Sequence, residues 1–361
     1  MKKRFLSILL TMLMVLCTAP FTAFAETGDV AINADNFPDA NFRKIVEGYD
    51  TTKADGTVGA DGVLSAAELE AVDEIECYDS GIANLKGIEY FTELTYLDCS
   101  NDDDSNKNTL TSLDLSKNTK LEYLYCYDNA ITSLDLSSNT NLILVNCSDN
   151  ALTSLKLGNN TSLIDLSCEN NALTSLDVSK NTGLKFFNCD GNKLTTLDVS
   201  NNTKLGESYG STDTQADGGL HCAKNNLTSL DVSKCENLSD EDFDCTGNTY
   251  KITAVNGVFN LKDLPGDFDL NNVVTDSWEG ATVKDGKLII DSKTNKVTYS
   301  YYCGSDKSKE VEFTLLVTHT TKSDDAKSPA TGDNNELGLF AFAGLISAVG
   351  VAFMLRRKHS M

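Results

Sequence analysis

Eight cysteines recur through the middle of the chain, and four consecutive ones lie 21 residues apart. The eight are Cys77, Cys99, Cys126, Cys147, Cys168, Cys189, Cys222 and Cys245. Thiols can ligate metals, form disulfides or act as nucleophiles. A zinc site needs closely spaced thiols such as C-x-x-C, which this chain lacks, and a nucleophilic cysteine needs a histidine placed to activate it.

The regular spacing favours a structural role for these thiols. Equivalent residues on stacked parallel strands keep their Cβ atoms about 4.8 Å apart, outside the range of about 3.5–4.5 Å that disulfides need. Free cysteine is also among the most buried residue types and packs as a small hydrophobe. We therefore predict a ladder of reduced, buried thiols, whereas the roles of Cys235 and Cys303 stay open because they lie off this ladder.

A group of carboxylates near the N-terminus could hold calcium. DGVLSAAE at 61–68 matches the second half of an EF-hand loop, in which glycine makes the turn and the last glutamate closes the cage. The first and third ligand positions fall on Thr57 and Gly59, so carboxylates would have to come from an expanded loop. The candidate ligands are Asp50, Asp55, Asp61 and Glu68. This interpretation predicts weak calcium binding, at about 10⁻⁴–10⁻³ M, and the alternative is that Glu68 only caps the helix that follows Ser65.

The chain offers little material for acid–base catalysis. It has three histidines and one tryptophan, His221 stands alone among the repeats, and no Ser-His-Asp, Cys-His or metal set is visible. We predict that the protein is not an enzyme and uses no cofactor apart from the weak calcium considered above. Paired carboxylates are the catalytic arrangement that so acidic a sequence leaves open.

The elements that position these residues are internal repeats. Four consecutive segments between Leu121 and Lys204 follow the pattern L-x-x-L-x-C-x-x-N-x-L-T-S-L-D-V-S-x-N-T-x. Looser copies flank them, and we count eight coils within 72–250, with extra residues after Cys99 and between 205 and 220. One coil cannot bury its own apolar side, so stacked coils must share a continuous column. The pattern predicts a solenoid with parallel β strands on its concave face and a mostly irregular convex side.

Within each L-x-C strand, successive side chains point to opposite faces. Leucine and cysteine are expected inside, and the asparagine after each cysteine is expected to satisfy the turning backbone from inside. On the concave face, we predict a ligand-binding surface formed by Tyr96, Tyr123, Tyr125, Tyr127, Leu144 and Phe186. Exposed aromatic residues fit binding hot spots, although cross-strand packing that stiffens the sheet would also explain them.

Two acidic regions accompany this surface. Asp165, Glu169 and Asp190 lie on the concave side and would favour a basic partner. A second row runs along the T-S-L-D-V-S segments and comprises Asp114, Asp135, Asp177, Asp198 and Asp231, interrupted by Lys156. We interpret the second row as a solvated edge.

The coils resemble the leucine-rich repeats of the internalin family. IANLKGIEYFTELTYLDC at 82–99 is similar to the 22-residue internalin coil, and the 21-residue coils with cysteine at the sixth position are similar to the internalin J type. The resemblance covers about half of the chain. It implies a surface binding protein, since several internalin-like proteins are host-cell adhesins, but it does not indicate a ligand.

Different patterns flank the repeats. Apolar residues of 36–70 suit two helices in a cap, 26–71, that covers the first coil. After the repeats, KLIID at 287–291, KVTYSYYC at 296–303 and VEFTLLVT at 311–318 are rich in β-branched and alternating residues. They predict a small all-β module at 251–318, which resembles the β-sandwich modules of bacterial surface proteins.

The first 25 residues have the three parts of a secretory signal peptide. A basic start at residues 2–4 is followed by an apolar run and by Ala-Phe-Ala, so cleavage is expected between Ala25 and Glu26. A membrane anchor is the alternative, but the apolar run is short for a span of about 20 residues.

The C-terminal end resembles the cell-wall sorting signal of Gram-positive bacteria, which the transpeptidase sortase reads. Its motif is Ser328, Pro329, Ala330, Thr331 and Gly332, followed by an apolar stretch at 337–355 and a basic tail. The family pattern is Leu-Pro-x-Thr-Gly, so Ser328 replaces the leucine and leaves the sortase class open. The resemblance implies cleavage after Thr331, linkage of Thr331 to peptidoglycan, a spacer at 319–332 and removal of 333–361. A plain single-pass anchor is the alternative.

The charge of the chain limits its partners. It has 53 acidic and 30 basic residues, a net charge of −23. Such a surface repels nucleic acid and anionic membranes and suits a soluble extracellular role. We predict a secreted, cell-wall-anchored, adhesin-like protein whose concave face binds a host or bacterial protein or a glycan. The alternative is a structural spacer or wall-matrix protein that has no defined ligand.

Overall fold

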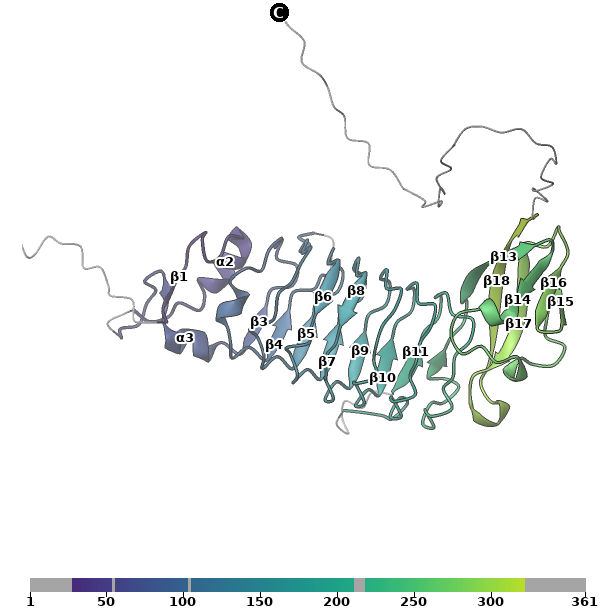
Figure 1. Ribbon diagram of the computed structural model, residues 1–361. Coiled ribbons are helices and arrows are strands. Elements are labelled where there is room, and N and C mark those ends of the chain that lie inside the picture. Colours follow the sequence, from purple (N-terminus) through teal and green to yellow (C-terminus); the bar gives the residue numbers. More distant parts are fainter. Residues whose placement is uncertain (1–27, 54–55, 103–104, 211–217, 322–361) are drawn as a thin grey trace, which may run out of the picture. The chain divides into compact units, whose positions relative to one another are not determined.

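The computed structural model describes residues 28–321, apart from 54–55, 103–104 and 211–217 (Figure 1). The chain divides into two compact units, 1–321 and 322–361, and every described residue belongs to the first. The predicted signal peptide, the cleavage site between Ala25 and Glu26, the motif at 328–332 and the segment 333–361 therefore lie outside the described residues. Within the described part, no helix has the length and apolar character needed to cross a membrane.

Eight short parallel strands form the main sheet, in the order β12-β11-β10-β9-β7-β5-β4-β3. They are β3 (Glu74–Glu76), β4 (Tyr96–Asp98), β5 (Tyr123–Tyr125), β7 (Leu144–Asn146), β9 (Asp165–Ser167), β10 (Phe186–Asn188), β11 (Gly219–His221) and β12 (Phe243–Asp244). Each coil contributes one strand, and the central residues pair in register, as Val145 does with Leu124 and with Leu166. This arrangement confirms the predicted leucine-rich-repeat solenoid.

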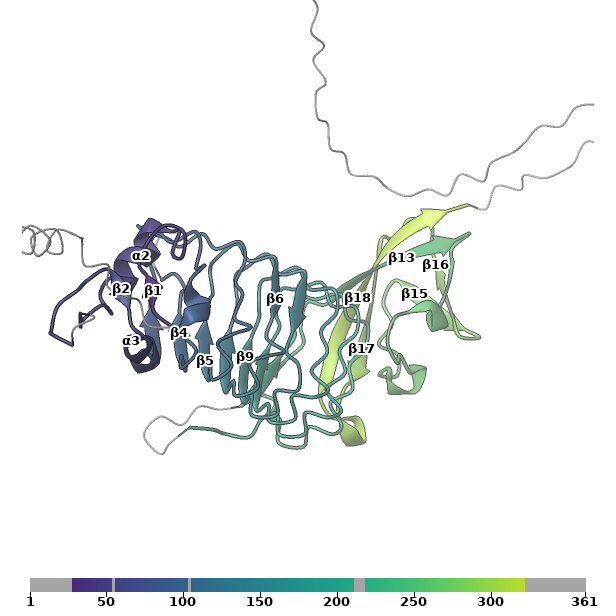
Figure 2. The same cartoon turned by 60° about the vertical axis from the view of Figure 1, so that its left-hand side comes forward.

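The opposite side of the coils is mostly irregular, as the sequence predicts. Its regular elements among the described residues are the short parallel pair β6 (Ser133–Asp135) and β8 (Ser154–Lys156) and the 3-10 turn η1 (Ile88–Tyr90). Figure 2 shows β6 on the far side of the coils from the main strands.

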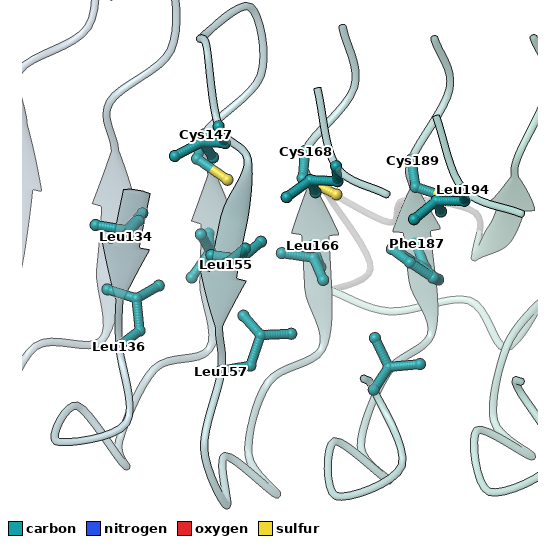
Figure 3. Packing of buried hydrophobic residues seen from close by; sticks show 14 of the residues in the cluster. Leu134, Leu136, Cys147, Leu155, Leu157, Leu166, Cys168, Phe187, Cys189 and Leu194 are labelled. Atoms are coloured by element: carbon teal, nitrogen blue, oxygen red, sulfur yellow. The ribbon is translucent and has the colours of Figure 1, made fainter. Parts of the chain in front are cut away.

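Leucine and cysteine fill the column between these two sides. All eight ladder cysteines are free thiols and are at most 1% exposed. Figure 3 shows Cys147, Cys168 and Cys189 at the same level of successive coils. Burial raises the pKa of Cys147 to about 12 and that of Cys168 well above its ordinary value, so these thiols stay protonated and unreactive.

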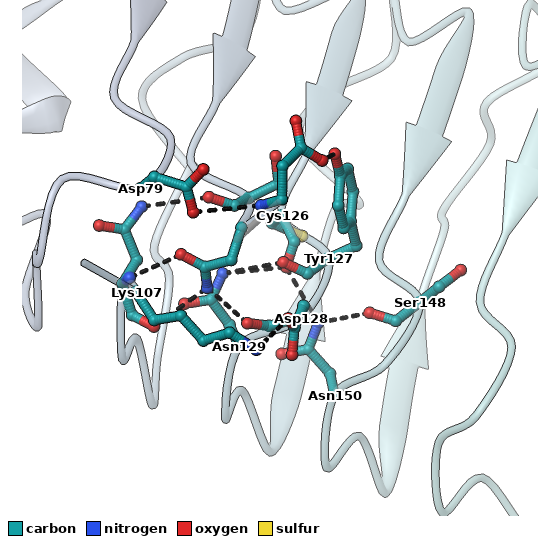
Figure 4. A network of polar contacts seen from close by, with 12 residues as sticks. Asp79, Lys107, Cys126, Tyr127, Asp128, Asn129, Ser148 and Asn150 are labelled. Carbon is teal, nitrogen blue, oxygen red and sulfur yellow. Dashed lines mark hydrogen bonds and ion pairs between the residues drawn. The ribbon is translucent and has the colours of Figure 1, made fainter. Parts of the chain in front are cut away.

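A row of buried or half-buried amides closes seven of the eight coils after the cysteine, and we call it the amide row. It comprises Asn108, Asn129, Asn150, Asn171, Asn192, Asn225 and Asn248. The side-chain nitrogen of Asn171 donates to the carbonyls of Cys147, Cys168 and Glu169, each at 3.1 Å. Its oxygen accepts from the backbone nitrogen of Leu152 at 2.8 Å. Figure 4 shows the same arrangement at Asn129 and Asn150, so each amide satisfies backbone groups of two neighbouring coils.

The six extra residues after Cys99 leave this pattern intact. Asn108 takes the amide-row position of that coil, and its side chain donates to the carbonyls of Cys77 and Cys99. Asn101 spans the base of the insertion, because its oxygen accepts from the backbone nitrogen of Asn108 at 2.6 Å. The column of this coil therefore keeps the arrangement of the other coils.

A second set of buried amides runs under the turns of the opposite side. It comprises Asn118, Asn139, Asn160, Asn181 and Asn202, all fully buried. Cys235 takes the next position of this set, and its sulfur lies 3.6 Å from the carbonyl oxygen of Asn202. The thiol that the sequence leaves without a role thus replaces an amide in the final turn.

Two helices and a short two-stranded antiparallel sheet cover the β3 end of the column, as Figures 1 and 2 both show. They are β1 (Val30–Ala31), α2 (Ala40–Val46), β2 (Val63–Leu64) and α3 (Ala66–Ala71). Phe37 and Phe42 are fully buried, and the ring centroid of Phe37 lies 6.4 Å from that of Phe91 in the second coil. These contacts shield the first coil from water, as the predicted cap requires.

The C-terminal module is one six-stranded sheet in the order β15-β16-β14-β13-β18-β17. Its strands are β13 (Thr249–Val255), β14 (Val258–Asn260), β15 (Ala281–Lys284), β16 (Lys287–Ile290), β17 (Lys296–Tyr302) and β18 (Glu310–Thr320), with the 3-10 turns η2 (Leu261–Asp263), η3 (Leu270–Asn272) and η4 (Ser305–Lys307). The sequence predicts an all-β module at 251–318 that resembles a β-sandwich, and the structure has an all-β module whose six strands form one sheet and extend from Thr249 to Thr320. Strand β13 follows directly on Asn248, the last member of the amide row, and pairs in parallel with the distant β18.

The module contacts backbone groups of the chain between β11 and β12. Tyr299 is buried and its hydroxyl donates to the carbonyl oxygen of Thr228. The carbonyl of Cys303 accepts from the backbone nitrogen of Val232 at 2.8 Å. Cys303 itself is 2% exposed, so the second thiol without a sequence-based role packs where the module meets the repeats.

Candidate ligand-binding face

We call one surface of the solenoid the strand face. It consists of the outward side chains of the eight main strands and of the residue that follows each ladder cysteine. In β4, β5, β7, β9 and β10 the central residue is buried and both outer residues are partly exposed. This alternation puts Tyr123 and Tyr125 toward solvent and Leu124 toward the column, as the sequence predicts.

Three tyrosines and a leucine meet on this face, and we call them the tyrosine cluster: Tyr96, Tyr123, Tyr125 and Leu144. The ring centroid of Tyr96 lies 6.2 Å from that of Tyr123 and 5.7 Å from that of Tyr125. Leu144 pairs in register with Tyr123. Burial raises the pKa of Tyr96 to about 12, and the negative charge of Asp98 is the second cause of this shift. The hydroxyl of Tyr96 therefore remains a neutral hydrogen-bond donor.

The other two predicted contact residues, Tyr127 and Phe186, have further contacts of their own. The hydroxyl of Tyr127 donates to the carboxylate of Asp102, which belongs to the insertion at the sheet edge. Phe186 is on β10, and its ring centroid lies 5.5 Å from that of His221. The sequence gives the right faces for both residues but groups them with the tyrosine cluster, from which strand order separates Phe186.

The acidic region lies on the same face beyond β7. Burial raises the pKa values of Asp165, Glu169 and Asp190, and neighbouring carboxylates add to the shift for Glu169 and Asp190. The Glu169 carboxylate accepts from the side chain of Asn188, and the Asp190 carboxylate accepts from the backbone nitrogen of Ala223. These carboxylates are held in place rather than free to turn away from one another.

Tyr209 is a feature of this face that sequence reasoning does not identify. It belongs to the segment between β10 and β11, and its hydroxyl donates to the carboxylate of Asp165 on β9. Near the start of this segment, Gly206 has a φ of +91°, and a Cβ at this position would lie 2.4 Å from the carbonyl oxygen of Asn237. The described part of the insertion thus borders the strand face.

The second predicted acidic row lies on the other side of the coils and has a local structural role. Asp114, Asp177 and Asp198 are exposed, and the carboxylate of each accepts from the backbone nitrogen of the serine two positions later. Lys156 pairs with Asp135 at 3.0 Å. These contacts close turns, which agrees with the interpretation as a solvated edge.

The predicted calcium ligands are engaged with the chain itself. One Glu68 oxygen accepts from the backbone nitrogens of Thr51 and Thr52, and the other accepts from Ser65 in a capping box. Burial raises the pKa of Glu68, but these hydrogen bonds together lower it by more, so the resulting pKa is about 2. Asp50 accepts from the backbone nitrogens of Asp61 and Gly62.

These contacts give Glu68 and Asp50 roles in the cap without any ion. Asp55 lies outside the described residues. Across the described ranges, no group of three or more His, Cys, Asp or Glu side chains is arranged to hold a metal ion. Weak calcium binding by this loop stays a prediction.

The C-terminal residues 329–360 match a family model described as the LPXTG cell wall anchor motif. The match begins at Pro329, after the serine that replaces the usual leucine. The motif indicates a secreted protein that is covalently attached to the cell wall of a Gram-positive bacterium.

The chain is 36% identical over 85 residues to internalin J of Listeria monocytogenes, a match that covers 24% of this chain and 8% of that relative's length. A solved structure of the functional domain of that protein from L. monocytogenes, described as including a cysteine ladder, is 20% identical and has a TM-score of 0.23, with coverage of 80% of this chain and 99% of that chain. Internalin C2 of L. monocytogenes is 17% identical with a TM-score of 0.45, covering 62% and 88%. The chain is therefore a leucine-rich-repeat protein that carries an LPXTG cell wall anchor motif and is similar to internalin J over part of its length.

Proposed function

We propose that this protein is an adhesin-like surface binding protein whose strand face, centred on the tyrosine cluster, binds a protein or glycan ligand. The observation that carries the proposal is the position of three adjacent tyrosine rings on the solvent side of a sheet whose core is complete without them. Tyrosine supplies a large contact area at low entropic cost, and its hydroxyl can hydrogen-bond to the ligand.

The rest of the chain supports this role by holding the cluster in place. Each ring projects from a strand whose central residue is fully buried, such as Leu97 and Leu124. Because the strands are locked in register through the amide row, the rings are preorganised and lose little freedom on binding. Anchoring through Thr331, after sortase has acted on the motif, would leave the described part of the chain outside the wall. We propose no catalytic step.

Replacing both Tyr123 and Tyr125 with alanine is expected to weaken ligand binding at least about 30-fold, since hot-spot residues each contribute about 2 kcal/mol or more. Both side chains point outward, so the melting temperature should change little. The mature protein, released from the wall by muramidase, would be tested on glycan and protein arrays, and cells that display it would be tested for adherence. Tyr302→Ala, a partly exposed tyrosine of the module, is the matched control.

Unchanged binding by the double variant would refute the role of the cluster. If the parent protein showed no binding to arrays or cells, the alternative of a structural wall spacer would replace the proposal.

A further inference from the structure

The strand face carries charge of one sign. None of the eight strands contains a lysine or arginine, although the face runs through eight coils. Seven carboxylates lie on it or directly follow its strands: Glu74, Glu76, Asp98, Asp165, Glu169, Asp190 and Asp244. The basic side chains near the central carboxylates are His221, beside Glu169 and Asp190, and Lys224, beside Asp190. The carboxylates of the face therefore meet no lysine or arginine from its own strands.

These carboxylates are divided by the tyrosine cluster. Asp98 lies on β4 beside Tyr96, and the acidic region begins on β9 with Asp165. β5 and β7 separate the two, so the carboxylate-bearing strands are three steps apart. At about 4.8 Å per step this is about 14 Å, the length of about four residues of extended chain. The order across the sheet is acidic, aromatic, acidic.

This order fits a flexible cation-bearing chain better than a single ion. A metal needs its ligands gathered in one place, whereas these carboxylates occupy separate regions on either side of three rings. Ammonium and guanidinium groups can pair with carboxylates and also stack on tyrosine faces. The repulsion between fixed like charges on the face falls when such groups bind.

We propose that the ligand of the strand face is a cationic polypeptide segment that lies across the strands. Basic residues about four positions apart pair with Asp98 on one side and with Asp165, Glu169 and Asp190 on the other. An apolar or aromatic residue between them packs on the tyrosine cluster. The inference rests on the proposed function, since it names the chemistry of the partner that the same face takes.

The test uses the mature protein released from the wall and three synthetic peptides of equal length, of which the first two have the same composition. One peptide places lysine–arginine pairs four residues apart around a tryptophan, a second gathers all basic residues at one end, and a third has glutamate in place of the basic residues. The first peptide is expected to bind at least about tenfold more tightly than the second, and its affinity should fall steeply as the salt concentration rises. The third peptide is expected not to bind. Equal binding of the first two peptides would overturn the proposed spacing.

A matched pair of charge variants locates the site. The first variant removes three charges from the strand face and is Asp165→Asn/Glu169→Gln/Asp190→Asn. Its amide oxygens can still accept the hydrogen bonds of Tyr209, Asn188 and Ala223. Asp114→Asn/Asp177→Asn/Asp198→Asn removes three charges from the opposite side and keeps the turn acceptors. The first variant is expected to weaken binding of the spaced peptide at least about tenfold and the second less than about threefold.

Equal effects of the two charge variants would mean that net charge alone attracts the peptide, and the inference would fail. It would also fail, while the proposed function stands, if the parent protein binds a neutral glycan or protein that depends on Tyr123 and Tyr125 but not on the three carboxylates. If binding depended neither on the tyrosines nor on the carboxylates, the inference and the proposed function would both fail.

Discussion

Asn171→Ala is expected to lower the free energy of unfolding by about 3–5 kcal/mol. The amide makes four hydrogen bonds to backbone groups, and alanine would leave those groups buried without partners. Each unsatisfied buried group costs about 1–3 kcal/mol, although relaxation and water entry would recover part of the sum. Urea unfolding followed by circular dichroism measures the change.

Asn141→Ala is the matched control for this variant. Asn141 is exposed and donates one hydrogen bond, at 3.2 Å to the carbonyl oxygen of Thr119. Its replacement should change stability by no more than about 0.5 kcal/mol. If the two variants were equally stable, the amide row would not be what closes the coils.

Two adjacent phenylalanines on β10 are expected to respond very differently to truncation. Phe187 is fully buried in the column, at a position where six of the other seven coils have leucine, isoleucine or valine and the eighth has Phe243. Phe187→Ala should cost about 3–5 kcal/mol (Figure 3). Phe186 is partly exposed against His221, so Phe186→Ala should cost less than about 1 kcal/mol. Both are measured by the same denaturant titration.

The comparison between these two variants tests the register of the repeat. A shift of the strand by one residue would exchange the two faces and would put Phe186 inside. A larger loss at Phe186 than at Phe187 would therefore contradict the assignment of the strand face, and with it the position of the tyrosine cluster.

The repeat column could be predicted from the sequence because its signals are local and recur. An apolar residue two positions before each ladder cysteine indicates which side chains of a three-residue strand are buried, and Leu124 and Cys126 follow that rule. The same alternation puts Tyr123 and Tyr125 outside. One strand per coil then follows from the spacing, because each coil makes one circuit.

Features that depend on contacts between distant segments could not be predicted in the same way. Tyr209 lies in an insertion without a period, so nothing in its neighbourhood indicates that it reaches Asp165 on β9. The parallel pairing of β13 with β18 joins residues more than 60 positions apart. Strand propensity indicates that both segments are extended but does not indicate their partner.

The role of Cys235 lies between these two cases. The asparagine of the repeated N-T pair was visible at each turn, and Cys235 follows Leu-Asp-Val-Ser-Lys at that same position. Only the geometry shows that this position is fully buried, at Asn202 for example, and faces the preceding turn. If this position had been known to be buried, Cys235 could have been assigned to the second set of buried amides.

The central claim is that one closed interior separates the buried thiols from the solvent-facing tyrosines, and thiol reactivity tests it most directly. With a water-soluble disulfide reagent at pH 8, the ten thiols between Cys77 and Cys303 are expected to react at least about 10³-fold more slowly in the native protein than in urea, because each requires an opening of the column. All ten should be titratable once the protein is unfolded. Rapid labelling of the native protein, or fewer than ten thiols after unfolding, would show that the column is open or cross-linked and would contradict the account.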